Sequence, residues 1–329
     1  MASTTRQALL QALSAAEGAY ISGQQLAQQL GVSRAAVHKA AAALTAQGYA
    51  LEAASRRGYR LLGGDPFCTE AVGPYPAPVQ LYDTLESTNR TAKLLALEGA
   101  VHGTLVLAGG QTAGRGRLGR SWVNAEGKAL YYTVAIKEPL AQPATLPLLA
   151  SLAVRRQLQL RYGVDCQIKW PNDLLLNGKK IVGILCESVS YGYQQQGRGI
   201  LCGIGINLAQ PQSYFDAADL PHGTSLALQG AAVDLATDPA WLAEGLTDFG
   251  FDRNLYTFAR DGFAPFREEY KAACINLGRR VTFDLPDGSQ GAGEAVDVDT
   301  EGRLVVRTDA GEQHVFTGEV SVHGIYGAV

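Results

Sequence analysis

The chain has 329 residues, of which 47% are hydrophobic and 18% are charged, and its net charge is −3. This length and composition predict two or three domains with sizeable cores and exclude an intrinsically disordered protein. The sequence has neither a signal-like N-terminus nor an apolar run long enough to cross a bilayer, so we expect a soluble cytoplasmic protein with no membrane partner.

The N-terminal segment differs from the rest in charge, since residues 1–63 carry +4 and the remainder carries −7. Apolar spacing predicts a helix over residues 4–16, and Ser22 and Gln25 form a plausible capping box at the start of a second. Gly31 is expected to end that helix and Ser33 to cap a third. Two short helices joined by a glycine turn indicate a helix-turn-helix.

Residues 51–62 alternate like a hairpin with residues 55–58 at its tip, so the module resembles a winged helix-turn-helix. Such a wing would place arginines on the phosphate backbone of DNA. A helical domain with a glycine turn is also compatible with plain oligomerisation or docking. The candidate DNA contacts are Ser33, Arg34, His38, Lys39, Arg56 and Arg57.

After a Gly- and Pro-rich stretch that is predicted to be a linker, residues 79–276 mix strand and helix patterns. Several strand-like runs follow one another directly, which favours a mixed sheet with helices and an α+β class. The strand-like runs are 105–108, 129–136, 166–170, 180–189 and 199–207, and the helix-like runs are 87–98, 146–162, 239–260 and 264–273.

The tail has a different pattern, because short alternating runs are separated by turn residues from residue 278 onward. These runs predict a small β-barrel. They cover residues 280–284, 291–299, 304–308 and 312–317. The five cysteines show no C-x-x-C spacing, so neither a disulfide framework nor a zinc site is expected.

The densest signal for chemistry is the segment 114–120 (GRGRLGR), where three arginines alternate with glycines. Glycine allows close backbone approach, and arginine offers donors that suit phosphate and carboxylate groups. The segment lacks the G-K-[ST] ending of a Walker loop, and a strand-like run follows it instead of a helix. Composition alone leaves an anion site and a solvated surface loop equally open.

Three further segments hold candidate site residues. Residues 169–173 (KWPND) would place Lys, Asn and Asp at a strand end, although taken alone the segment favours a simple turn with a buried Trp. Asn177-Gly178 predicts a hairpin turn that sends Lys179 and Lys180 to opposite faces, one of them toward an anionic partner. The bare faces of Gly203 and Gly205 suggest that a flat ligand lies against this strand.

Taken in order, five motifs resemble those of biotin protein ligases. They are Ser87-Thr88-Asn89, GRGRLGR, KWPND, K-x-x-G-I-L-x-E from Lys180, and G-x-G-x-N from Gly203. The resemblance covers nearly the whole chain, and the N-terminal module is similar to that of the bifunctional group that also represses biotin synthesis genes. It implies a winged helix-turn-helix (1–63), a linker (64–78), a catalytic domain with a class II synthetase-like biotin/lipoate ligase fold (79–276) and an SH3-like barrel (277–329).

The resemblance implies the site residues one by one. Biotin would be bound by Ser87, Thr88, Asn89, Gln111, Gly114, Arg115, Gly116, Arg117, Lys180, Gly183, Gly203 and Gly205. ATP would be bound by Arg117, Arg120, Trp122, Lys169, Asn172, Asp173, Lys180 and Asn207, with Trp122 stacked on adenine. The implied catalytic residues are Lys180, Arg115, Arg117 and Asp173, and Asp173 would also contact Mg²⁺.

The implied reaction joins the biotin carboxylate to the α-phosphorus of ATP and then passes biotin to a lysine of the biotin carboxyl carrier protein of acetyl-CoA carboxylase. Bound adenylate would order the arginine loop and favour a homodimer that binds operator DNA. Two alternatives remain open: a lipoate or octanoate ligase with similar chemistry, and a ligand-sensing repressor without catalysis. The sequence offers no compelling general base beyond Asp173.

Overall fold

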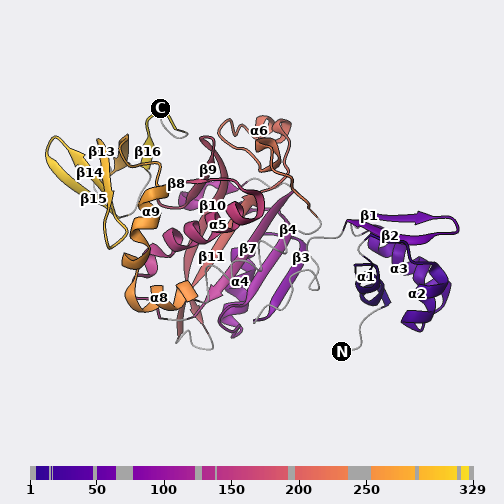
Figure 1. Cartoon of the computed structure of the whole chain (residues 1–329). Helices are drawn as coiled ribbons and strands as arrows, with labels where there is room; N and C mark the ends of the chain where they lie inside the picture. Colours follow the sequence, from indigo (N-terminus) through magenta and orange to yellow (C-terminus); the bar gives the residue numbers. More distant parts are fainter. Residues whose placement is uncertain are drawn as a thin grey trace. The chain divides into compact units, whose positions relative to one another are not determined.

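The structure is a computed structural model that describes residues 5–14, 16, 18–46, 50–63, 77–122, 128–137, 139–191, 197–235, 253–285, 289–316 and 320–325. The chain divides into two compact units (Figure 1), one of residues 1–73 and 234–240 and the other of residues 74–233 and 241–329. Of the predicted linker, residues 64–76 lie outside the described residues. Each unit is considered by itself below.

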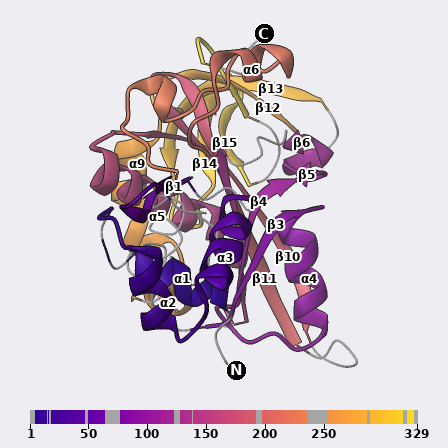
Figure 2. The same ribbon diagram turned by 90° about the vertical axis from the view of Figure 1, so that its right-hand side faces the viewer.

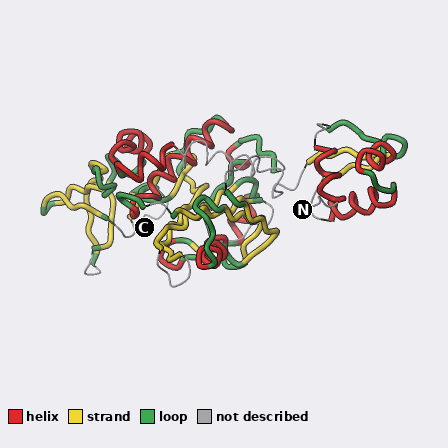
Figure 3. The backbone as a smooth tube through the Cα atoms, turned by 90° about the horizontal axis from the view of Figure 1, so that it is seen from below, coloured by secondary structure: helices red, strands yellow, loops and turns green. Residues whose placement is uncertain are grey.

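The N-terminal unit consists of three helices and a two-stranded hairpin, as predicted, and helix predominates in it (Figure 3). Its core forms where the apolar faces of the helices meet the hairpin, around Leu9, Leu26, Val37 and Leu44. The elements are α1 (Thr5–Ser14), α2 (Gly23–Leu30), α3 (Arg34–Ala46), β1 (Ala50–Ala54) and β2 (Gly58–Gly63).

The predicted helix signals are confirmed in detail. Ser22 and Gln25 form a reciprocal capping box at the start of α2, which satisfies backbone N–H groups that the helix itself leaves unpaired. Gly31 ends α2 in the left-handed conformation with φ 64°. The Ser33 hydroxyl then accepts a hydrogen bond from the Ala36 N–H at 3.1 Å and so caps α3.

The wing hairpin is fixed against the segment that precedes α2. Ile21 and Tyr59 exchange backbone hydrogen bonds of 2.9 Å, so β2 pairs with this segment through an antiparallel bridge. Gly58 lies directly on it, because a Cβ at this position would be 2.1 Å from the Ile21 carbonyl oxygen. The orientation of the wing therefore depends on a glycine with φ 101°.

The second unit is organised on a seven-stranded sheet of order β3-β4-β7-β11-β10-β9-β8. Only the β3–β4 pair is parallel, so the sheet is mixed, as predicted. The strands are β3 (Val79–Leu85), β4 (Leu105–Gln111), β7 (Ala129–Ile136), β8 (Gln167–Lys169), β9 (Asp173–Leu176), β10 (Lys179–Tyr191) and β11 (Gly197–Asn207).

Two helices cover opposite faces of this sheet (Figure 2): α4 (Thr88–Leu97) and α5 (Leu146–Tyr162). Ala92 and Ala96 of α4 pack with Val106, Ala135 and Leu201 in one buried cluster. Because side chains alternate along a strand, the neighbours of these sheet residues point to the other face, where α5 packs on β10 and β11. The small alanines let α4 lie close to the sheet.

The remaining elements are short helices and the C-terminal strands. A five-stranded antiparallel sheet of order β15-β14-β13-β12-β16 forms the C-terminal domain. No described helix is both long and apolar enough to cross a membrane. The elements are η2 (Pro143–Thr145), α6 (Gln212–Ala217), η4 (Ala227–Gln229), α8 (Arg253–Asp261), η6 (Ala264–Phe266), α9 (Arg267–Ala273), β12 (Arg280–Asp284), β13 (Gln290–Val298), β14 (Leu304–Thr308), β15 (Gly311–Val315) and β16 (Val320–Val322).

The C-terminal sheet is attached to the central sheet at the KWPND turn. The Trp170 indole N–H donates to the Gly302 carbonyl at 3.0 Å, and both the indole and the backbone N–H of Trp170 are buried. On α9, Arg267 donates to the Val298 carbonyl at 2.6 Å and pairs with Asp297, which Lys271 also contacts at 2.9 Å. The turn is thus held from the C-terminal side.

The fold departs from the sequence expectations at a few short elements. Neither β3 nor β9 nor β16 is predicted, because three to seven residues show too little alternation to stand out from their neighbours. The outer strands of the C-terminal sheet, β15 and β16, do not pair with each other among the described residues. Of the helix predicted over residues 239–260, only residues 253–260 are in the described part of the chain, and there they belong to α8 (Arg253–Asp261).

A test of the wing geometry is the substitution Gly58→Ala. The added Cβ would meet the Ile21 carbonyl in a left-handed backbone conformation, so we expect the N-terminal unit to lose about 3 kcal/mol of stability. Amide hydrogen exchange of the full chain, followed in peptides from residues 50–63, measures this loss. The matched control is Gly31→Ala, which also has positive φ but open space, and which should cost about 1 kcal/mol. Equal protection in the two variants would contradict the proposed seating of the wing.

Candidate active site

A cavity of about 320 Å³ lies on the face of the central sheet that also carries α4. It is lined by nearly all of the residues predicted for biotin or ATP, which come together from five separate motifs. Gly114 is the predicted residue that does not line it, because Trp122 and Gln111 close off the face of this glycine. The sequence motifs therefore converge on one pocket.

The arginine segment forms a small hairpin at the mouth of this cavity. Its strands are β5 (Gly114–Arg115) and β6 (Ser121–Trp122), joined by the 3₁₀ turn η1 (Arg117–Gly119). The Gly116 N–H donates to the Arg120 carbonyl at 2.7 Å, which closes the hairpin. Leu118 at the tip is exposed and has φ 56°, a left-handed conformation that is costly for a leucine.

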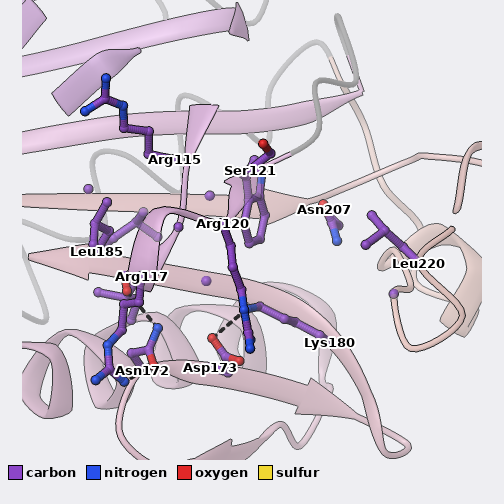
Figure 4. A pocket seen from close by; sticks show the side chains of 18 of the residues that line it. Arg115, Arg117, Arg120, Ser121, Asn172, Asp173, Lys180, Leu185, Asn207 and Leu220 are labelled. Carbon is purple, nitrogen blue, oxygen red and sulfur yellow. Dashed lines mark hydrogen bonds and ion pairs between the residues drawn. The ribbon is translucent and has the colours of Figure 1, made fainter. Parts of the chain in front are cut away.

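The three arginines of this hairpin point in different directions (Figure 4). Arg117 donates to the Asn172 amide oxygen at 3.1 Å, so it ties the hairpin to the KWPND turn. Arg120 extends toward Asp173 and Lys180, whereas Arg115 is exposed and its guanidinium points away from them. The hairpin thus supplies cationic donors at one end of the cavity.

The KWPND turn and β10 meet in an ion pair. Lys180 Nζ lies 2.7 Å from Asp173 Oδ1, and the Asp173 side chain is only 9% exposed. Asn172 is fixed beside this pair, since its Nδ2 donates to the Ile184 carbonyl at 2.9 Å. A carboxylate this deeply buried requires a cationic partner. Of the two lysines predicted to point to opposite faces, Lys180 is therefore one that has an anionic partner.

The peptide bond between Trp170 and Pro171 is cis. Trp170 is 2% exposed, as expected for a turn with a buried Trp, and its backbone N–H donates to the Asn276 side chain at 2.8 Å. Lys169 is buried next to it. The turn with a buried Trp is confirmed, and the segment also lines the cavity, where its role as a binding site stays a prediction.

Two cross-strand rows of the central sheet form the floor below the cavity. In the first row, Thr133, Gly203 and Leu185 are direct partners on β7, β11 and β10. The Asn89 side chain of α4 lies on Gly203, because a Cβ at that glycine would be 2.0 Å from Asn89 Oδ1. The bare face predicted for a ligand is thus covered by an amide of the protein itself.

The second row consists of Tyr131, Gly205 and Gly183 on the same three strands. The Trp122 indole lies across both glycines, whose added Cβ atoms would be 2.8 Å and 2.3 Å from ring atoms. Lys180 Nζ stands 5.4 Å from the centre of the indole ring, a cation–π distance. These two glycines accordingly make room for an indole, which in turn forms the surface that faces the cavity.

The N-terminus of α4 holds the neutral polar end of the pocket. The Gln111 amide oxygen accepts from the Thr88 N–H at 2.8 Å and from the Thr88 hydroxyl at 3.1 Å, so the orientation of this amide is fixed. Ser87 is the N-cap residue, but its hydroxyl makes no capping hydrogen bond. Its buried side chain lines the cavity instead.

One wall of the cavity was not predicted. It is formed by residues 214–223 around α6, and it is joined to Asn207 at the end of β11. Asn207 Nδ2 donates to the Thr224 carbonyl at 3.0 Å, and its Oδ1 accepts from Gln210 at 2.7 Å. Burial raises the pKa of the Tyr214 phenol in this wall, so it stays neutral. No spaced motif marks this segment, so only its position after Asn207 could have identified it.

The described residues do not gather three His, Cys, Asp or Glu side chains around a common point. Asp173 is a hard oxygen donor at the cationic end of the cavity, which suits a Mg²⁺ ion held mostly by substrate phosphates. Cys166 and Cys186 are poor nucleophiles. Burial raises the pKa of Cys166 to about 12, and a hydrogen bond with Cys202 together with burial raises that of Cys186.

In the N-terminal unit, the predicted DNA contacts lie on the surface. The side chains of Arg34, His38 and Lys39 on α3 are exposed, and Arg56 occupies the wing tip with φ 66°. Arg57 stacks on the Tyr20 ring at 4.3 Å. The Tyr20 phenol is in turn hydrogen bonded to Glu52, which raises the pKa of the phenol and lowers that of the carboxyl. Tyr20 therefore braces the wing, and sequence analysis missed it.

Comparisons with known proteins agree with this arrangement. Residues 81–207 match the biotin/lipoate A/B protein ligase family, residues 5–60 an HTH domain and residues 277–322 the biotin protein ligase C terminal domain. The chain is 33% identical to the bifunctional ligase/repressor BirA of Bacillus subtilis, with 98% of this chain and 100% of that protein covered.

A second relative, the biotin–[acetyl-CoA-carboxylase] ligase of Paracoccus denitrificans, is 35% identical, with 73% of this chain and 98% of that protein covered. Among solved structures, a biotin protein ligase from Aquifex aeolicus in complex with biotin and ATP is similar, with a TM-score of 0.60 and 26% identity. This similarity covers 75% of this chain and 98% of that one.

The seating of Trp122 is tested by Gly183→Ala. The new Cβ would lie 2.3 Å from the indole, so we expect the indole to leave its place on the sheet. In ¹⁹F NMR of protein labelled with 5-fluorotryptophan, the resonance assigned through Trp122→Phe should shift. The control is Gly116→Ala in the arginine hairpin that carries Trp122. Its added Cβ would be 3.5 Å from the nearest atom, so the Trp122 resonance should stay unchanged. An unmoved resonance in the Gly183 variant would show that Trp122 does not lie on these glycines.

Proposed function

The chain belongs to the family of the bifunctional ligase/repressor BirA, and on that premise we propose that it activates biotin with ATP and attaches it to a lysine of the biotin carboxyl carrier protein of acetyl-CoA carboxylase. The observation that carries this proposal is the polarity of the cavity. Lys180, Asp173 and Arg120 lie together at one end. The Trp122 indole lies on Gly183 and Gly205, and Asn89 lies on Gly203 in the next row of the sheet, beside Thr88 and Gln111 of the pocket lining.

Such a cavity matches the two ends of the substrate. The biotin carboxylate and the ATP phosphates are anionic and would bind at the end that holds Lys180 and the arginine hairpin. The ureido ring of biotin is neutral and would bind at the end that holds Thr88 and Gln111. The exposed face of Trp122 is available for stacking on adenine.

In the first step, a biotin carboxylate oxygen attacks the α-phosphorus of ATP, and pyrophosphate leaves. The carboxylate is a weak nucleophile, so alignment of the two reactants and stabilisation of charge on the phosphoryl oxygens supply most of the catalysis. Lys180 and Arg120 would supply cationic donors to these oxygens, and Arg117 holds Asn172 and the turn in place. We propose Lys180, Arg115, Arg117 and Asp173 as the catalytic residues, with Arg120 as a further cationic donor.

Mg²⁺, when bound with ATP, would neutralise phosphate charge, and Asp173 is the carboxylate suited to contact it. The ion pair with Lys180 keeps the Asp173 carboxylate oriented toward the cavity in the absence of substrate. Lys169, buried at the base of the same turn, adds a further positive charge beside the phosphates.

The product of the first step, biotinyl-5′-adenylate, is a mixed anhydride that water would destroy. The arginine hairpin lies over the mouth of the cavity and can exclude water from the anhydride. The carrier lysine then attacks the biotinyl carbonyl, and AMP leaves. This sequence of steps needs no covalent enzyme intermediate, and the raised pKa values of Cys166 and Cys186 argue against one on either of these two thiols.

The C-terminal sheet supports the nucleotide end of the site. Val320 of β16 lines the cavity, and the hydrogen bond from Trp170 to Gly302 holds the KWPND turn. We propose the domain boundaries 1–63, 64–78, 79–276 and 277–329, which the matches to residues 5–60, 81–207 and 277–322 support.

The second role is repression of biotin synthesis genes through the N-terminal module. The exposed basic side chains of α3 and of the wing suit the phosphates and bases of operator DNA. We further propose that bound adenylate orders the arginine hairpin and favours a homodimer, which would then bind a two-fold operator. A repressor without catalysis is disfavoured, because Asp173 and Lys180 form an intact ion pair in the pocket.

The ligase proposal is tested by transfer of labelled biotin to a carrier domain with ATP, with and without Mg²⁺. For Lys180→Ala we expect the rate of adenylate formation to fall by about 10²- to 10³-fold, because a cationic donor to the phosphoryl oxygens is lost. Lys179→Ala removes a lysine on the opposite face of the same strand and should keep the wild-type rate. Full activity of Lys180→Ala would refute the assignment of the site.

The repressor proposal is tested by fluorescence anisotropy with DNA from upstream of biotin synthesis genes. We expect Arg56→Ala to lower the slope of log affinity against log salt by about 1, because one phosphate contact is lost. Biotin with ATP should raise the affinity of the wild type. Gln28→Ala, an exposed change on α2, serves as the control. An affinity indifferent to biotin and ATP would contradict the coupling between ligand and DNA.

A further inference from the structure

Glu187 on β10 has no part in the chemistry described above, yet it contacts the pocket through Asn89. Asn89 is buried, and its side chain lies across the first cross-strand row of the floor. Its Nδ2 donates to Glu187 Oε2 at 2.6 Å and to the Leu185 carbonyl at 3.3 Å. Its Oδ1 accepts from the Thr133 hydroxyl at 2.6 Å. The amide is therefore held on three sides.

These contacts decide which way the amide faces. A threonine hydroxyl can donate or accept, so Thr133 alone would tolerate either orientation of the Asn89 amide. An ionised carboxylate and a backbone carbonyl only accept, so Glu187 and the Leu185 carbonyl both require Nδ2 on their side, and the bond to the carboxylate is the shorter, at 2.6 Å against 3.3 Å. A flipped amide would bring two acceptor oxygens together at hydrogen-bond distance. Glu187, which makes the shorter of these two bonds, is thus the main side chain that keeps Oδ1 above Gly203.

With the amide so oriented, both N–H groups of Asn89 are used within the protein. Oδ1 accepts from Thr133 and has a second lone pair for a donor on a ligand. Asn89 lines the cavity beside Thr88 and Gln111, at its neutral polar end. A ligand that offers an N–H group there forms a hydrogen bond, whereas one without a donor leaves a buried acceptor unpaired.

We propose that Glu187 is a positioning residue that sets the ring specificity of the site by presenting Asn89 Oδ1 to a ureido N–H of biotin. The inference rests on the proposed ligase function. The ureido ring of biotin carries N–H donors, whereas the dithiolane ring of lipoate carries none. A site built to receive a hydrogen bond rejects an analogue that cannot make it far more strongly than an apolar pocket does. Glu187 therefore separates biotin from lipoate without touching either.

The test uses steady-state transfer to the carrier domain, with biotin, dethiobiotin and lipoate as acyl substrates. In Glu187→Gln the neighbour of Asn89 can donate as well as accept, so only the longer bond to the Leu185 carbonyl still requires Nδ2 on that side, and the orientation of the amide is weakened. We expect KM for biotin and for dethiobiotin to rise about tenfold, with KM for ATP and kcat nearly unchanged. The preference for biotin over lipoate should fall. Glu98→Gln, the same change at an exposed position after α4, is the control.

A second pair of variants covers the case in which Glu187→Gln does not fold. Thr133→Val removes the donor to Asn89 Oδ1 without a change in shape, and Thr133→Ser restores it, so the rise in KM for biotin should appear in the first and disappear in the second. An unchanged KM for biotin in Glu187→Gln, or equal rises in KM for biotin and ATP with a lower Tm, would overturn the proposal. If the wild type itself transferred no biotin, the proposed function would fail instead.

Discussion

The pocket depends on one steric constraint: three positions at the centre of the main sheet cannot carry a side chain. Above Gly203 lies the Asn89 amide, and above Gly183 and Gly205 lies the Trp122 indole. An ordinary side chain at any of these positions would displace the group that faces the cavity. The glycines therefore determine how close α4 and the arginine hairpin can approach the sheet, and the site is formed in the space above them.

The electrostatics of the site follow from this geometry. The Trp122 indole and the arginine hairpin hold Lys180 near Asp173, so a buried carboxylate and its cation are in place before any substrate binds. Substrate phosphates would then meet donors that are already oriented, which lowers the reorganisation that catalysis has to overcome. The hydrogen bond from the Trp170 indole to the Gly302 carbonyl, between β13 and β14, means that the position of the KWPND turn also depends on the C-terminal domain.

The parts of the fold and of the site that depend on local patterns could be predicted from the sequence. The capping box at Ser22, the turn at Gly31 and the strands around Gly203 are local, so spacing and residue type were sufficient. The role of Gly203 was different, because a bare face in a sequence does not reveal whether a ligand or a side chain covers it. Asn89 reaches that face from a helix more than one hundred residues away.

The unpredicted residues share this non-local origin. Thr133 and Glu187 matter because strand register places them beside Gly203. The wall formed by residues 214–223 and the contribution of Val320 depend on how separate segments fold over the cavity. Such contacts are determined by tertiary packing, for which a single sequence carries no periodic signal.

The most direct test of this account is a crystal structure of the protein with biotin and a non-hydrolysable ATP analogue. We expect Asn89 to remain on Gly203 and Trp122 on Gly183 and Gly205, with the biotin ring beside Asn89 and its carboxylate toward Lys180. A ligand in direct contact with the three glycines, with Asn89 and Trp122 displaced from the sheet, would contradict the central claim that these glycines seat the side chains of the protein.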